Sequence, residues 1–160
     1  MASNLNWKKL SNHEAKELCR EFTAKEVWNA VNSLGRGKAP GPDGYNVEFY
    51  IKYWSIVGAN IISAIREFQI TAKLLVHWGN TTLVFVPKTE GPAKITDFRP
   101  IALCNVLYEI LSKALVNRIR PCIKRLISSE QCAFIEGRRI QDNILLANEI
   151  INSVSKSKRK

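Results

Sequence analysis

The residues of this chain with the clearest chemical potential are cations placed beside strand ends. Lys88 follows a β-branched and aromatic run that Pro87 ends, and Arg99 stands at the start of the next extended run. Cations at the ends of neighbouring strands can both reach one anionic ligand, and a planar guanidinium suits bidentate contact with phosphate. We therefore predict a phosphate-facing pair, with two ordinary loop cations as the alternative that the pattern leaves open.

A second cationic group lies in a short predicted loop before a helix. Gly137 allows close backbone approach, Arg138 and Arg139 supply positive charge, and a helix start follows, which together suit a passing strand of nucleic acid. Lys113 and Arg120 fall on one polar face of another predicted helix and can contact a phosphate backbone. A charged helix face is more often simply solvated, and that alternative stays open.

Acidic and metal-binding groups are sparse in this sequence. The three aspartates, Asp43, Asp97 and Asp142, lie in different segments, so nothing supports paired-carboxylate chemistry. We therefore predict no catalytic residue and no metal ligand. The four cysteines are widely spaced, and no Cys-x-x-Cys pair exists to suggest zinc. We interpret them as buried or incidental thiols of an intracellular protein.

Composition favours a folded chain with a polyanionic partner. The 160 residues are 46% hydrophobic and carry 24 Lys and Arg against 14 Asp and Glu, a formal net charge of +10. Residues 1–80 contribute +3 and residues 81–160 contribute +7. An uneven basic surplus of this kind points to a polyanion. No apolar run approaches the roughly 18 residues of a membrane-spanning helix, so we expect no membrane partner.

Hydrophobic periodicity predicts an α+β fold that is mainly helical, with one small antiparallel ribbon. Strands are expected at 81–86 and 98–103, and a turn-rich loop at 35–44. Asn105 is expected to cap an amphipathic helix that Pro121 kinks or restarts. Further helices are expected from Ser11 to about residue 22, from a Thr23–Glu26 capping box to Gly35, and at about 47–54, 57–71 and 141–154.

Four motifs then occur in a fixed order. They are KAPGPDG at 38–44, VFVPK at 84–88, DFRPIAL at 97–103, and QCAFIEGR at 131–138 with DNI at 142–144. In this order and spacing they closely resemble the amino-terminal part of the reverse transcriptase of LINE-type (non-LTR) retrotransposons, a class of transposable element. The resemblance covers about residues 22–154.

The resemblance implies the fingers part of a right-hand polymerase, without its palm. It implies an amino-terminal helical extension with the Gly/Pro-rich loop at 1–45, a fingers segment at 46–154 and a basic tail at 155–160. In this family Lys88 and Arg99 match triphosphate-contacting residues. The loop that holds Gly137, Arg138 and Arg139 lies near the template, so we predict that these three bind it, with Lys113 and Arg120 as further backbone contacts.

The resemblance also implies what the 160 residues cannot do alone. The catalytic aspartates of the family belong to the palm and neither palm motif is present. We therefore expect a truncated RNA-directed DNA polymerase, inactive by itself, and we leave open whether the chain is an enzyme. No cofactor is expected here, because Mg²⁺ would be needed only by the full-length polymerase.

Partners and alternatives follow from the same reasoning. The family's partners are an RNA template, a DNA primer and a dNTP, in an intracellular setting, nucleus or cytoplasm. We also expect self-association through an exposed palm-facing surface, such as the apolar stripe at 107–119. The alternatives are a decayed, non-functional open reading frame and a non-enzymatic module that binds nucleic acid or protein.

Overall fold

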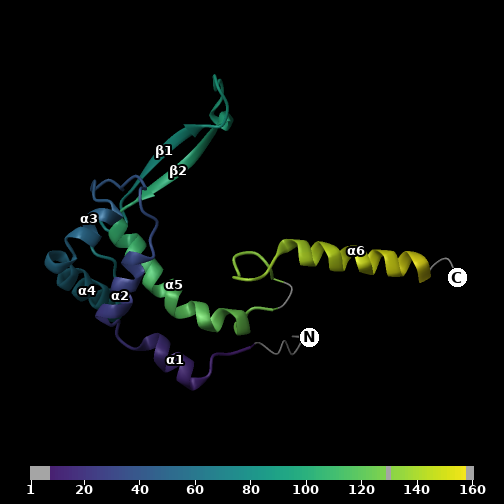
Figure 1. Cartoon of the computed structure of the whole chain (residues 1–160), viewed down its shortest axis with the longest axis horizontal. Helices are drawn as coiled ribbons and strands as arrows, with labels where there is room; N and C mark the ends of the chain where they lie inside the picture. The colour runs from purple at the N-terminus through teal and green to yellow at the C-terminus, as the bar shows by residue number, and fades with distance from the viewer. Residues whose placement is uncertain (1–7, 129–130, 158–160) are drawn as a thin grey trace. The chain divides into compact units, whose positions relative to one another are not determined.

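Helices make up most of the chain, together with one two-stranded antiparallel sheet (Figure 1). The computed structural model describes residues 8–128 and 131–157. The elements in chain order are α1 Asn12–Cys19, α2 Ala24–Asn32, α3 Val47–Lys52, α4 Trp54–Thr71, β1 Thr81–Pro87, the 3-10 helix η1 Ile95–Asp97, β2 Phe98–Cys104, α5 Val106–Leu126 and α6 Ile140–Ser157. The predicted α+β class is confirmed.

The chain forms two compact units. One is Arg20–Arg118, and the other combines the described residues of Met1–Cys19 and Ile119–Lys160. The family resemblance implied segment boundaries at residues 45 and 154. These boundaries separate functional parts of a polymerase, not compact units, and they stay a prediction. Residues 1–7 of the predicted extension and 158–160 of the predicted basic tail lie outside the described residues.

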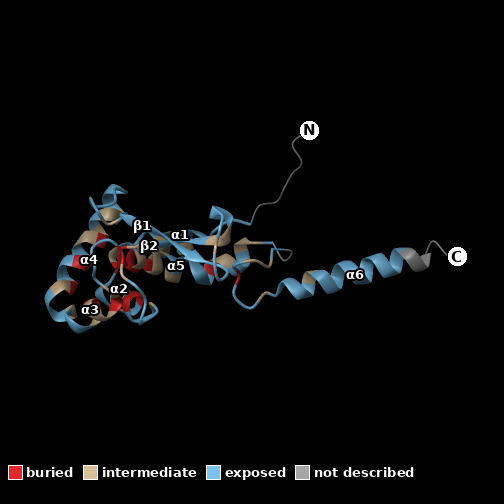
Figure 2. Ribbon diagram, turned by 90° about the horizontal axis from the view of Figure 1, so that it is seen from above, coloured by how far each residue is buried: buried red, intermediate tan, exposed pale blue. Residues whose placement is uncertain are grey.

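The core of the unit Arg20–Arg118 lies where α2, α3 and α4 pack with the first half of α5. The predicted capping box starts α2: Thr23 Oγ1 accepts from the Glu26 N–H at 3.2 Å, and the Glu26 carboxylate accepts from the Thr23 N–H at 2.9 Å. Figure 2 shows buried residues on α2, α3 and α4. The core residues are Phe22, Val27, Ala30, Val31, Val47, Tyr50, Ile61, Ile65, Val106, Ile110, Leu111 and Ala114.

One expectation about α5 is wrong. The apolar stripe is not bare in this region, because Ile110, Leu111 and Ala114 are buried in the core, although Ile119 is 42% exposed. At Pro121 either a kink or a restart was expected; the helix does not restart there, because Pro121 lies inside it, and the kink stays a prediction. A proline nitrogen has no hydrogen to donate to the carbonyl four residues earlier, but the helix continues to Leu126.

A buried asparagine joins three segments of the same unit. Asn105, only 4% exposed, accepts from the Asp43 N–H at 3.1 Å and donates from Nδ2 to the His77 carbonyl at 2.7 Å. Its side chain therefore bridges segments instead of capping α5. Gly41 lies against this point, since an added Cβ would come within 2.5 Å of the Asn105 nitrogen. The Gly/Pro-rich loop is thus held as a scaffold.

An arginine buried in the same unit ties α5 to the start of α2. Arg118 has a side chain only 7% exposed and donates from Nε to Glu26 Oε1 at 3.0 Å. Its guanidinium also lies 3.7 Å from the centre of the Phe22 ring, a cation–π contact. Arg20 donates to the same carboxylate at 2.7 Å. Glu26 therefore serves as a helix cap and as an ion-pair partner of two arginines.

The sheet is a ribbon with both faces largely open. Pairing runs from Thr81 opposite Cys104 to Pro87 opposite Phe98. Successive residues of a strand point to opposite faces, and apolar side chains are exposed on each face, among them Phe85 on one and Ile101 on the other. A two-stranded ribbon is marginally stable on its own. This ribbon therefore has little packing to hold it.

Candidate functional site

The ribbon brings the two cations of the first predicted pair onto one face. Arg99 lies opposite Val86, and Lys88 follows two residues after Val86. The Lys88 N–H donates to the Asp97 carbonyl at 2.7 Å, which continues the pairing past Pro87. Lys88 and Arg99 are therefore diagonal neighbours across the strands, at a typical spacing of roughly 7–8 Å.

The two cations differ in their present partners. Lys88 is exposed, and its Nζ donates to the Thr96 carbonyl at 2.8 Å. Arg99 is also exposed, and within the described residues its guanidinium makes no hydrogen bond or ion pair. The Arg99 guanidinium can therefore contact an incoming anion directly. The Lys88 ammonium would first have to break one hydrogen bond, to the Thr96 carbonyl.

An aspartate orders the connection between the strands. Asp97 Oδ2 accepts from the Lys94 N–H at 2.9 Å and from the Ala93 N–H at 3.0 Å. These backbone donors lower the pKa of the Asp97 carboxyl below its usual value. Asp97 belongs to a motif, but no role was predicted for it; in the structure its carboxylate holds the connection that leads into β2.

The second cationic group lies in the other unit, and there Arg138 is turned inward. Its guanidinium donates to the carbonyls of Gln131 at 2.7 Å, Lys124 at 3.2 Å and Ile127 at 3.3 Å, and also to that of Ser128. Carbonyls at the end of a helix lack partners within the helix. Arg138 therefore closes the end of α5 and fixes the loop, and its predicted contact with a template stays a prediction.

The two neighbours of Arg138, Gly137 and Arg139, are exposed. Arg139 is exposed, and its guanidinium has no hydrogen bond or ion pair among the described residues. Gly137 has φ +79°, a left-handed conformation that favours glycine. Phe134 has φ +63° and is fully exposed, at 104%. Left-handed backbone at a residue other than glycine costs on the order of 1–3 kcal/mol.

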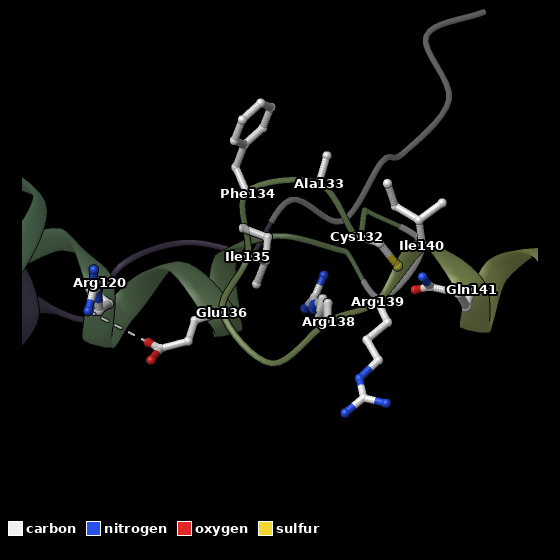
Figure 3. Close-up of a pocket in the computed structure, with 10 residues that line it drawn as sticks. All are labelled: Arg120, Cys132, Ala133, Phe134, Ile135, Glu136, Arg138, Arg139, Ile140 and Gln141. Carbon is white, nitrogen blue, oxygen red and sulfur yellow. Dashed lines mark ion pairs between the residues drawn. The ribbon is translucent and has the colours of Figure 1, made fainter.

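The loop and its neighbours line a wide, open hollow of about 620 Å³. Figure 3 shows Phe134 and Arg139 projecting on opposite sides of the loop, with Arg138 between them. The lining residues are Arg120, Cys132, Ala133, Phe134, Ile135, Glu136, Arg138, Arg139, Ile140 and Gln141. Three arginines against one glutamate leave the hollow positively charged.

The two predicted contacts on α5 have different surroundings. Lys113 is half-buried in the unit Arg20–Arg118. Arg120 belongs to the other unit and lines the hollow. Its Nη1 atom lies 3.9 Å from Glu136 Oε2, and both side chains are at least half exposed. An ion pair this exposed is weak, so Arg120 can exchange Glu136 for a phosphate at little cost.

Carboxylates do not gather to form a metal site in the part of the chain that the structure describes. No three His, Cys, Asp or Glu side chains lie close enough there to hold a metal ion. Asp97 is occupied by backbone N–H groups, and Asp43 accepts from the Tyr45 N–H at 3.0 Å. The described residues do not fit the magnesium centre of a polymerase, and we derive no step through one.

Two other features bear on the predicted environment. No helix in the described ranges 8–128 and 131–157 combines the length and apolar character needed to cross a membrane. The four cysteines, all within the described residues, form no disulfide, and they range from the exposed Cys19 to the buried Cys122.

The fold and site together define a class, namely a basic α+β chain with exposed cations on a ribbon and around a loop. A scan against protein-family models gave no match. The chain is similar to the "Transposon TX1 uncharacterized 149 kDa protein" of Xenopus laevis, with 25% identity over 143 residues. The match covers 89% of this chain but only 11% of that protein. The similarity fits an origin in a transposable element.

Proposed function

We propose that this chain is the nucleotide- and template-handling part of a LINE-type reverse transcriptase. The observation that carries the proposal is the ordered set of four motifs, two of which meet in the ribbon with Lys88 and Arg99 on one face. The similarity to a transposon protein over 89% of the chain supports the same origin. The parent polymerase would use an RNA template, a DNA primer and a dNTP.

In this proposal the ribbon binds the triphosphate. Charge grows on the phosphate oxygens as phosphoryl transfer proceeds, so cations aimed at them stabilise the transition state. Arg99 would make a bidentate contact, and Lys88 would add a point charge after leaving the Thr96 carbonyl. Asp97 would keep the ribbon connection in place while the ligand binds.

The basic loop binds the template strand. Arg139 supplies the outward charge, Gly137 lets a phosphate approach the backbone, and Arg138 supports the loop from within. Arg120 adds a second cation at the hollow. Contacts to phosphates carry no sequence information, so binding should tolerate many sequences.

In this proposal the chain takes no part in the bond-forming step of the polymerase. Polymerases use two divalent ions about 3.5–4 Å apart, and those ions need grouped carboxylates. The described residues contain no such group. We expect the 160-residue polypeptide alone not to extend a primer on RNA. Extension by the purified chain would overturn this part of the proposal.

The experiment that tests the proposed function measures binding to a labelled RNA–DNA primer–template at two salt concentrations. Affinity should fall at least about 10-fold between 50 and 200 mM salt, because the cations release counterions from the phosphates. A variant with Arg139→Ala should bind more weakly and depend less on salt. Absence of salt-sensitive binding by the wild-type chain would overturn the proposal.

A second candidate function, a protein-interaction module, is favoured by α6. This helix carries exposed apolar residues at Ile144, Leu145, Leu146, Ile150, Ile151 and Val154. Such a surface is typical of a protein-binding site. Analytical ultracentrifugation of the wild type and of an Ile144→Ser, Ile151→Ser variant tests this. Oligomers that the double variant abolishes would support it, and a monomeric wild type would rule out self-association.

A further inference from the structure

Phe134 is the least protected large apolar side chain among the described residues. Its exposure is 104%, and it stands at the rim of the basic hollow. Water contact with a phenyl ring is unfavourable, and nothing in the described unit compensates for it. Its backbone conformation is also unfavourable, because φ +63° is disfavoured for a residue with a side chain of this size. Packing does not explain why a phenylalanine occupies this position.

The backbone on both sides of Phe134 is nevertheless tied down. The Arg138 N–H donates to the Ile135 carbonyl at 3.2 Å, and the Arg138 guanidinium binds Gln131 on the other side of Phe134. Ile135, the next residue, is buried and anchors the chain. A strained residue held by its surroundings is typical of a ligand-binding site.

The charge around the ring identifies the ligand. Arg139 and Arg120 line the same hollow as Phe134, and Glu136 is its one acidic lining residue. An aromatic ring and cations that line one hollow, where the cations can contact a phosphate chain, are the groups that proteins use to bind single-stranded nucleic acid. An apolar protein partner would offer no anion to Arg139, which has no ion pair among the described residues.

We infer that Phe134 is a stacking platform for an unpaired base of a single-stranded nucleic acid, whose phosphates contact Arg139 and Arg120. This rests on the proposed function, because it assigns the template loop a contact with bases as well as phosphates. A strand that crosses the loop would place a base on Phe134 and a phosphate beside Arg139, which lie on opposite sides of the loop (Figure 3). Stacking is tolerant of sequence, since every base has a π face.

The test compares binding of single strands of about 12 nucleotides to variants at one position. Phe134→Ala and Phe134→Leu should weaken affinity roughly 5- to 100-fold, and Phe134→Trp should keep it. Ile140→Ala is the matched control. Ile140 is 60% exposed and lines the same hollow, but it has no aromatic face. RNA and DNA strands are measured separately to identify the natural ligand.

An abasic strand of the same length separates stacking from charge. It keeps the phosphates and lacks the bases, so Phe134→Ala should have no effect on its affinity, whereas Arg139→Ala should weaken binding to both strands. Thermal melting checks that the variants are folded. Because Phe134 is fully exposed, its truncation should leave the melting temperature unchanged.

The outcomes separate this inference from the proposed function. Salt-sensitive binding by the wild type that Phe134→Ala leaves intact overturns the stacking inference alone. A Phe134→Leu variant with wild-type affinity overturns it too, because apolar contact would then suffice. If the wild type binds no nucleic acid, the proposed function fails and this inference fails with it. If Phe134→Ala changes only the oligomeric state, the ring is a protein contact.

A chemical footprint provides a second measurement. Cys132 is partly exposed and lines the hollow, whereas Cys19 is exposed on α1. A bound single strand should slow alkylation of Cys132 more than alkylation of Cys19 in the same sample, as measured by mass spectrometry. Equal slowing of both thiols, or of neither, would show that the strand does not occupy the hollow.

Discussion

The guanidinium of Arg138 lies 3.2 Å from the carbonyl oxygen of Lys124, a residue in the last turn of α5. It also reaches the carbonyl of Gln131 at 2.7 Å. One side chain thus satisfies unpaired carbonyls of a helix end and fixes the loop that follows. The two adjacent arginines of this loop therefore have different roles, with Arg138 inside and Arg139 outside.

Arg138→Ala should destabilise the protein, whereas Arg139→Ala should not. Removing Arg138 breaks its hydrogen bonds to four carbonyls, a loss of about 1–3 kcal/mol in the free energy of unfolding. Removing Arg139 should change stability by less than about 0.5 kcal/mol and reduce the salt slope of RNA binding by about one. Chemical denaturation and binding titrations measure the two effects. Equal stability losses would contradict the division of roles.

Arg99→Ala and Lys88→Ala should both reduce photo-crosslinking to a labelled deoxynucleoside triphosphate. We expect the larger loss for Arg99→Ala, because a guanidinium can contact phosphate through two N–H groups. Lys94→Ala is the control, since Lys94 is an exposed cation in the same ribbon connection. If all three variants lose crosslinking equally, general charge and not this pair attracts the triphosphate.

Glu26→Gln should make stability less dependent on pH in acid. Burial raises the pKa of the Glu26 carboxyl, but hydrogen bonds from Arg118, Arg20 and Thr23 outweigh it and leave the pKa far below the ordinary 4.5. A lowered folded-state pKa stabilises the protein above pH 4.5, and this stabilisation is lost as pH falls below that value. Urea midpoints between about pH 3 and 6 should therefore fall more steeply for the wild type. Parallel curves would contradict the assignment.

Gly41→Ala should destabilise the protein more than Gly44→Ala. At Gly41 an added Cβ would lie 2.5 Å from backbone atoms of Cys104 and Asn105, so the chain must move, at a cost of about 1–3 kcal/mol. At Gly44 an added Cβ meets nothing within 4 Å, and only φ +76° opposes it, at about 1 kcal/mol. The free energies of unfolding measure the difference. A larger loss at Gly44 would show that the loop is not held against Asn105.

Local signals predicted the elements well. The Thr23–Glu26 capping box starts α2 as expected, and the β-branched run ended by Pro87 forms β1. These features depend on residues at most a few positions apart. The first helix ended early, at Cys19 instead of about residue 22, because Phe22 enters the core outside any helix.

Long-range partners could not be predicted from the sequence. The side chain of Asn105 bonds Asp43 and His77, which lie 62 and 28 positions away. Arg138 was identified as an important cation of its loop, but its carbonyl partners depend on where α5 ends. The positive φ of Phe134 was also not predicted, since nothing in its motif indicates a left-handed backbone conformation at that residue.

The open ribbon has a consequence for how its cations meet a ligand. Backbone amides of β1 and β2 should exchange with deuterium much faster than those of α2, because few apolar contacts oppose local opening. Lys88 and Arg99 would then lie on an element that opens easily. A bound triphosphate would have to immobilise the strands before both cations could hold it, and part of its binding energy would be used to order the protein.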